Sequence, residues 1–249
     1  MYAPVPTLGF ADKAESFTAE RLAECTGYLK VFHANHKGIG CCGSRPGTSC
    51  RHSGSQAVVA WIGVEPAQGM GVFSNDQAKV VGPALRNDVK GLNAVHQILD
   101  NTAMTTAVGH SMGSLGAMEA AKTELPVDNL VLVGDVGAPD NVTSVNDLHL
   151  NPGGTVYRGT YDWDHIAEVG HGLGWQRKST EDPGFGAVTF GTDGTTAPDG
   201  TVENPTKTHD GQTGGKDGVY GYFDRGTESS SNQAKIALGL SDQLTNVKR

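Results

Sequence analysis

Short apolar segments alternate with helix-like patterns along most of this chain, and this alternation constrains its fold more than any other feature. Six segments are expected to be strands: residues 28–33, 57–63, 105–110, 129–134, 155–159 and 187–191. Residues 57–62 and 130–133 are apolar at every position, as strands are when helices cover both faces of a sheet. The pattern predicts an α/β protein with a mostly parallel central sheet and helices on both faces.

The longest expected helix begins near Ser74, because the segment Ser74 to Gln77 has the pattern of a capping box. Pro83 is expected to kink this helix or to restart it. Apolar residues then recur at steps of three and four, which predicts one buried stripe. The stripe consists of Leu85, Val89, Leu92, Val95 and Leu99.

Two further helices are expected, over residues 112–123 and over residues 232–240, the second capped by Ser231. Residues 191–218 are dense in Gly, Thr, Asp and Pro and contain almost no apolar side chain, so they are interpreted as a long surface loop. The chain has 249 residues, and we expect residues 1–249 to form a single domain.

Charge and composition exclude several classes of partner. Lys and Arg together number 19 against 27 Asp and Glu, and the net charge of −8 disfavours binding to a phosphate backbone, so no nucleic acid is expected. No apolar run approaches the roughly 20 residues of a membrane-spanning helix. The 35 glycines indicate many tight turns rather than a helical bundle.

All four cysteines, Cys25, Cys41, Cys42 and Cys50, lie near the N-terminus. Their spacing matches no zinc site, and the nearby His33, His36 and His52 are spaced irregularly, so neither a metal nor another cofactor is expected. A disulfide-linked loop and free thiols both remain open. Disulfides would favour an exported protein, secreted or in the cell envelope, whose signal segment is not part of this sequence.

The segment Thr105 to Ser114 is an apolar strand followed at once by a helix, with the pattern G-x-S-x-G at the joint. This context predicts a nucleophile elbow, in which Gly109 and Gly113 relieve backbone collisions around Ser111. Gly116, Ala117, Ala120 and Ala121 are expected to keep the helix slim where it packs against the sheet. The backbone N–H of Met112, at the helix N-terminus, could then stabilise an oxyanion. The alternative is a glycine turn in which Ser111 is only an N-cap, and His110 is expected to be structural.

Several separated blocks of the chain resemble the α/β-hydrolase superfamily, and more narrowly an actinobacterial α/β-hydrolase family catalogued as a domain of unknown function. They are AVVAWIG, GHSMGSLG, NLVLVGDVGAPD, VYRGTYDWDHI followed by HG, DPGFGAVTF, a histidine ahead of YFD, and a closing S-x-N-x-A-x-I-A-x-G. The resemblance covers about residues 57–239, and residues 1–56 match it poorly. It implies an α/β-hydrolase fold and a triad in the chain order Ser, acid, His.

The resemblance aligns Asp164 with the acid position of the family, while Asp162 and Asp135 remain the alternatives. Solvated loop carboxylates are expected for the two that are not the acid. Of the later histidines, His209 lies where the fold places its base, although more residues separate it from Tyr222 than the family pattern has. The main rival is His171.

Two other histidines, His149 and His165, are expected at the surface or beside the site. A second oxyanion donor is expected either from residues 34–38, after the first strand, or from Pro46, Gly47 and Thr48, which resemble a P-G-T loop of the family.

The chain is therefore interpreted as a serine hydrolase that cleaves a small-molecule or lipid-like ester through a triad of Ser111, His209 and Asp164, without a cofactor. Two alternatives remain. One is an acyltransferase that passes the acyl group to a sugar or alcohol. The other is a non-catalytic binding module on the same fold.

Overall fold

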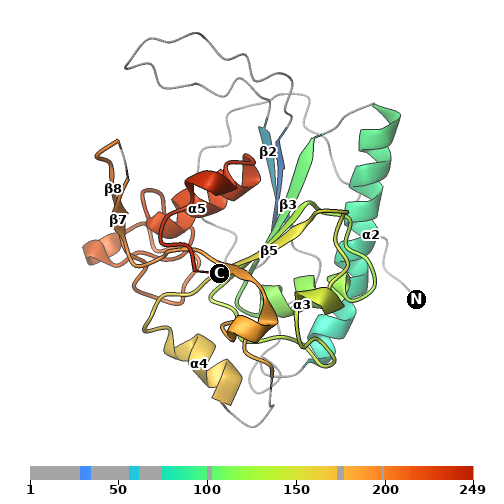
Figure 1. Cartoon of the computed structure of the whole chain (residues 1–249), viewed down its shortest axis with the longest axis horizontal. Helices are drawn as coiled ribbons and strands as arrows, with labels where there is room; N and C mark the ends of the chain where they lie inside the picture. The colour runs from blue at the N-terminus through green and yellow to red at the C-terminus, as the bar shows by residue number, and fades with distance from the viewer. Residues whose placement is uncertain are drawn as a thin grey trace.

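The computed structural model describes residues 29–34, 56–61, 75–99, 103–172, 177–197 and 199–248. In this part of the chain six strands form one sheet in the order β2–β1–β3–β4–β5–β6 (Figure 1). Strands β3 to β6 run parallel, whereas β1 is antiparallel to both of its neighbours. The mostly parallel sheet is therefore confirmed. The strands are β1 Leu29–Ala34, β2 Gln56–Trp61, β3 Met104–His110, β4 Asn129–Val133, β5 Thr155–Gly159 and β6 Val188–Thr189.

Helices cover both faces of the sheet, as the apolar strands require. Helices α2 (Asp76–Ile98) and α3 (Met112–Ala121) lie on one face, and α5 (Glu228–Ala237) lies on the other (Figure 1). Helix α4 (His165–Gly172) follows β5. None of the helices in the described residues is both long enough and apolar enough to span a membrane.

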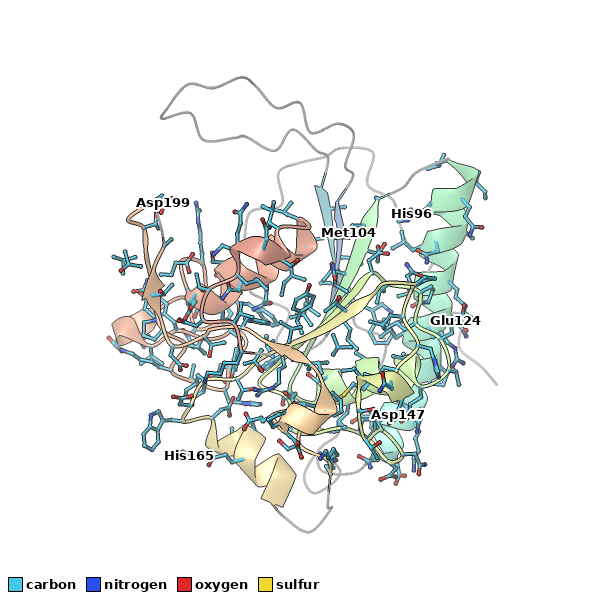
Figure 2. All side chains as sticks on the ribbon, viewed as in Figure 1. His96, Met104, Glu124, Asp147, His165 and Asp199 are labelled. Atoms are coloured by element: carbon cyan, nitrogen blue, oxygen red, sulfur yellow. The ribbon has the colours of Figure 1, made fainter. Side chains whose placement is uncertain are left out.

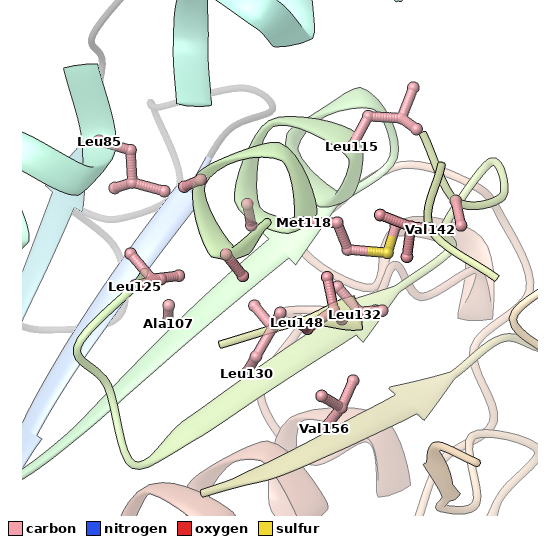
Figure 3. Close-up of a cluster of buried hydrophobic side chains, with 14 of the residues drawn as sticks. Leu85, Ala107, Leu115, Met118, Leu125, Leu130, Leu132, Val142, Leu148 and Val156 are labelled. Atoms are coloured by element: carbon pink, nitrogen blue, oxygen red, sulfur yellow. The ribbon is translucent and has the colours of Figure 1, made fainter. Parts of the chain in front are cut away.

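Side chains of the central strands alternate between two buried clusters. On β4, Leu130 and Leu132 pack beneath α2 and α3 (Figure 3), while Val131 and Val133 pack on the opposite face with Ile236 of α5. The edge strand β2 differs from this pattern, because Ala57, Val59 and Ala60 are exposed. For residues 57–61 the expectation of cover on both faces was wrong, because this strand lies at the edge of the sheet, and Ile62 lies outside the described residues.

The buried stripe of α2 differs from the predicted one in its second half. Leu85 and Val89 are buried and Leu92 is partly buried, but Val95 and Leu99 are exposed. The helix buries His96 instead, at the same spacing of three and four residues. The stripe therefore follows the helical period of 3.6, and the apolar character of Val95 and Leu99 misled the prediction.

The N-terminal end of α2 also departs from expectation. Its N-cap is Asn75 rather than Ser74, and the Asn75 side chain makes no cap hydrogen bond. Instead Asn75 Nδ2 donates to Asp140 and its Oδ1 accepts from Arg177 Nε, so it joins α2 to two distant loops. The helix does not restart at Pro83 but continues to Ile98.

Helix α5 begins four residues earlier than predicted. Its N-cap is Thr227, whose hydroxyl accepts the backbone N–H of Ser230, and Ser231 lies inside the helix. Within residues 191–218 the structure has a short hairpin, β7 (Thr195–Thr196) and β8 (Val202–Glu203), and a 3-10 turn, η4 (Lys216–Gly218), and the other residues described there have irregular backbone. The long loop is thus present, but it is not wholly at the surface.

Candidate functional site

Ser111 lies at the turn between β3 and α3, in an unusual backbone conformation. Its φ is 53° and its ψ is −125°, a region that residues with a side chain rarely adopt. The backbone N–H of Ser111 donates to the carbonyl oxygen of Val133 at 3.1 Å, which holds the turn against β4. The side chain is therefore presented at the carboxyl end of the parallel strands.

Small residues around the turn permit the close contacts that it requires. A Cβ atom on Gly109 would lie 2.7 Å from Ser114 Cα, a backbone atom that cannot move aside, so Gly109 has the predicted part. Gly116 differs from expectation, because a Cβ there would meet Val81 of α2 at 2.5 Å rather than the sheet. A Cβ on Gly82 of α2 would lie 2.9 Å from the backbone nitrogen of Ala120 in α3, so these two glycines allow the two helices to pack closely.

The structure brings Ser111, His209 and Asp164 together from three distant parts of the chain. His209 Nε2 lies 2.7 Å from Ser111 Oγ, and His209 Nδ1 lies 2.8 and 2.9 Å from the two carboxylate oxygens of Asp164. Because a carboxylate only accepts hydrogen bonds, Nδ1 carries the imidazole proton and Nε2 accepts from the serine hydroxyl. This protonation pattern leaves Nε2 able to take the serine proton.

Asp164 is the most enclosed member of the three, with 1% of its surface exposed. Burial works against its charged form, yet hydrogen bonds from His209, from the Tyr222 hydroxyl and from the Ala167 backbone N–H together hold the pKa of this carboxyl below its ordinary value. Asp164 is therefore ionised at neutral pH although it has almost no contact with solvent.

Tyr222 is a residue beside Asp164 to which sequence reasoning gave no role. It is fully buried, and its hydroxyl donates to Asp164 Oδ2 at 2.7 Å. Gly134 has a φ of +52°, and a Cβ on it would lie 2.7 Å from the Tyr222 ring and 3.2 Å from Asp164 Oδ2. The YFD block, which contains Tyr222, and the glycine after β4 were the sequence features that pointed to this contact. Neither of them shows that the Tyr222 hydroxyl bonds to Asp164.

His209 is held by its backbone as well as by its ring. The Nε2–H of His110 donates to the His209 carbonyl at 2.6 Å, and the two imidazole rings lie 5.1 Å apart. Burial, followed by the neighbouring His209, lowers the pKa of His110 to about 4, so His110 is neutral in the folded protein. His110 thus has the structural part that was expected of it.

The extra residues between His209 and Tyr222 form a loop with a closed base. Backbone N–H groups of Tyr222 and Phe223 donate to the carbonyls of Asp210 and Gly211, which brings the two ends of the loop together. Inside the loop the buried Asp224 carboxylate accepts from the Gly221 and Gly214 backbone and from Thr213. The insertion therefore leaves the position of His209 intact.

The two alternative carboxylates do not reach His209. Asp162 is exposed, as expected for a loop carboxylate. Asp135 is not solvated as predicted but 1% exposed. Its two carboxylate oxygens both lie 2.8 Å from Thr180 Oγ1 and share that hydroxyl proton, and the carboxylate lies 3.8 Å from Arg158 Nε. A carboxylate after β4 is therefore used to pair with Arg158 inside the fold.

Of the other late histidines, His149 and His165 are exposed, and His165 lies at the start of α4 on the outside of the molecule (Figure 2). His165 Nδ1 contacts Glu168 at 3.0 Å. The backbone of His171 belongs to α4, and its side chain lies outside those described.

Met112 is the first residue of α3, so its backbone N–H is among those without a partner inside the helix. Of the two segments expected to supply a second donor, residues 35–38 and residues 46–48 fall outside the described residues, and Ala34 is the last residue of β1. All four cysteines, His36 and His52 also lie outside the described residues, and of His33 only the backbone is described, in β1. Among the residues that are described, no cluster of three or more His, Cys, Asp or Glu could hold a metal ion.

Comparison with known proteins gives one match. A family model described as alpha/beta hydrolase matches residues 43–173, slightly more than half of the chain. Ser111 and Asp164 fall inside the matched span, whereas His209 lies beyond its C-terminal end. No curated protein and no solved structure matches the chain.

Proposed function

The chain belongs to the alpha/beta-hydrolase family, and from this premise we propose that it is a serine hydrolase that cleaves carboxylic esters through an acyl-enzyme on Ser111. The observation that carries the proposal is the line of short hydrogen bonds from Ser111 Oγ through the His209 ring to Asp164. Its order along the chain, Ser then Asp then His, is that of this fold.

The first half-reaction forms the acyl-enzyme. As Ser111 Oγ attacks the ester carbonyl carbon, His209 Nε2 takes the hydroxyl proton, and Asp164 stabilises the imidazolium through Nδ1–H. Negative charge develops on the carbonyl oxygen, where the backbone N–H of Met112 and the positive end of the α3 dipole stabilise it. The tetrahedral intermediate then collapses, the carbon–oxygen bond to the alcohol breaks, and His209 returns its proton to the leaving oxygen.

The second half-reaction releases the acid. A water molecule gives a proton to His209 Nε2 and attacks the acyl carbon, and the proton then returns to Ser111 Oγ as the carboxylic acid leaves. An alcohol in place of water would make the same chain an acyltransferase. The substrate is accordingly a small-molecule or lipid-like ester whose carbonyl reaches Ser111.

The test is labelling by a fluorophosphonate probe together with turnover of a short p-nitrophenyl ester. Ser111→Ala is expected to lose the label and to lower kcat by roughly a thousandfold or more. Ser241→Ala, at an exposed position, is the matched control and is expected to keep both. Labelling and turnover that persist in Ser111→Ala would overturn the proposal, and product analysis with an added alcohol distinguishes hydrolysis from acyl transfer.

A further inference from the structure

The hydroxyl of Tyr222 has two partners that determine the direction of its hydrogen bonds. The backbone N–H of Tyr161 donates to Tyr222 Oη at 3.2 Å, so the single hydroxyl proton is left to donate to Asp164 Oδ2 at 2.7 Å. Burial and the adjacent Asp164 charge both raise the pKa of Tyr222, which keeps the phenol protonated. Tyr222 is therefore a fixed donor to Asp164.

This donor opposes the cost of burying a carboxylate. Asp164 has almost no solvent to satisfy its oxygens, so each donor that faces it stabilises the anion over the neutral acid. His209 and Tyr222 supply side-chain donors from opposite ends of the same loop, and Ala167 supplies a backbone donor from α4. Without the Tyr222 hydroxyl, the side-chain donor left to Asp164 Oδ2 would be the Nδ1–H of His209, which Oδ2 shares with Oδ1.

We propose that Tyr222 is a positioning residue of the site, whose hydroxyl holds the Asp164 carboxylate toward His209 and disfavours transfer of the Nδ1 proton to it. The inference rests on the proposed function, because it matters for turnover only when His209 is the base. Gly134 belongs to the same arrangement, since any side chain there would occupy the space of the Tyr222 ring.

Other titratable groups face this cluster. His110 lies against the rings of His209 and Tyr222. Asp210 and Glu168 add negative charge near Tyr161. All of these groups are unchanged in the variants below, so a difference between variants reports the Tyr222 hydroxyl alone.

The test compares Tyr222→Phe with Tyr157→Phe, because both tyrosines belong to the same apolar cluster and only Tyr222 bonds to Asp164 among the described contacts. In Tyr222→Phe, kcat for the ester is expected to fall about tenfold with KM nearly unchanged, the effect of losing one hydrogen bond to a charged group. The acid limb of the pH profile is expected to move to higher pH by about half a unit or more, because the negatively charged His209–Asp164 pair loses a stabilising donor.

A second variant keeps the hydroxyl and so guards against a folding defect. Replacement of Tyr222 with 3-fluorotyrosine makes the phenol a stronger donor and is expected to move the acid limb to lower pH. The inference would be overturned if Tyr222→Phe kept the wild-type kcat and the wild-type position of the acid limb. It would also be overturned if the acid limb moved in the same direction along the pH axis in both variants. If Ser111→Ala stays active, the proposed function itself fails, whereas an inactive Ser111→Ala with an unaffected Tyr222→Phe overturns only the role of Tyr222.

Discussion

The turn at Ser111 and the loop that carries His209 are built in different ways. The turn is local, because β3, the serine and α3 are consecutive in the sequence and Gly109 removes a side chain that would collide with Ser114. The loop has no regular structure at His209, which is positioned by contacts with His110 and Asp164, while residues 222 and 223 hold the backbone of the two residues that follow it. A nucleophile can therefore be encoded by a short motif, while its base depends on contacts between distant segments.

The largest expected effect comes from removing the ring that joins the two regions. His209→Gln leaves Ser111 without a proton acceptor, so kcat/KM is expected to fall by roughly a thousandfold or more and to lose its decline toward acid pH. The measurement is ester turnover from pH 5 to 9. His171→Gln is the comparison and is expected to keep both rate and profile, and the reverse result would assign the base to α4.

Exchange of carboxylates separates an effect on chemistry from an effect on stability. Asp164→Asn removes the acceptor that orients the imidazole, and kcat is expected to fall by roughly a thousandfold or more, a loss out of proportion to any fall in the melting temperature. Asp135→Asn removes one of the two carboxylates that face the buried Arg158 and leaves only Glu181 as its charge partner, so the melting temperature is expected to fall while kcat changes little. The two are compared by turnover and thermal unfolding, and a larger loss of kcat in Asp135→Asn would contradict the assignment of the acid.

The sequence predicts the turn at Ser111 better than the surroundings of His209, because the turn is local and the loop is positioned by distant segments. The strands and α3 follow from apolar runs and small residues, because those signals act within a few positions. The alternation of Leu130 and Val131 between opposite faces is such a signal, and the structure confirms it.

Features that depend on distant partners were harder to predict. The cap of α5 moved to Thr227, where the following N–H of Glu228 donates to the Asn204 carbonyl, a contact across more than twenty residues. Asp135 was expected in solvent because Thr180 and Arg158, its partners, lie far along the chain. The hydroxyl of Tyr222 is likewise assigned by three-dimensional contact alone.

A substitution at Gly109 tests whether the turn is as rigid as its contacts indicate. In Gly109→Ala the new Cβ would lie 2.7 Å from Ser114 Cα, so the turn must shift, and we expect a loss of about 1–3 kcal/mol in stability and about tenfold in kcat. Gly91→Ala in α2 is the matched control. It has open space around it and is expected to be more stable by about 1 kcal/mol, because alanine favours the helix. Equal effects from both substitutions would show that the turn adapts.

An effect on stability that is confined to acid pH is expected at His110, the last residue of β3, which donates to the carbonyl of His209 and so joins the two regions. Its pKa is about 4 in the folded protein, because of burial and then of His209, against about 6.5 when unfolded. The unfolded state therefore binds more protons between these values. Stability from this group is complete above about pH 6.5 and is lost progressively as the pH falls toward 4, by about 3 kcal/mol.

His110→Gln retains an N–H at the same reach without a titrating ring, so its free energy of unfolding is expected to vary less across this window. Urea unfolding at several pH values measures the difference between the two proteins. The difference in the free energy of unfolding between the two proteins is the quantity to compare. Burial also lowers the pKa of His96, and this group makes stability fall as the pH falls in wild type and in His110→Gln alike. Asp164 and Asp224, with pKa values held below their ordinary range, lose their stabilisation only at lower pH. Parallel curves for wild type and His110→Gln between pH 4 and 6.5 would mean that His110 is solvated, and that the loop carrying His209 is not held by β3.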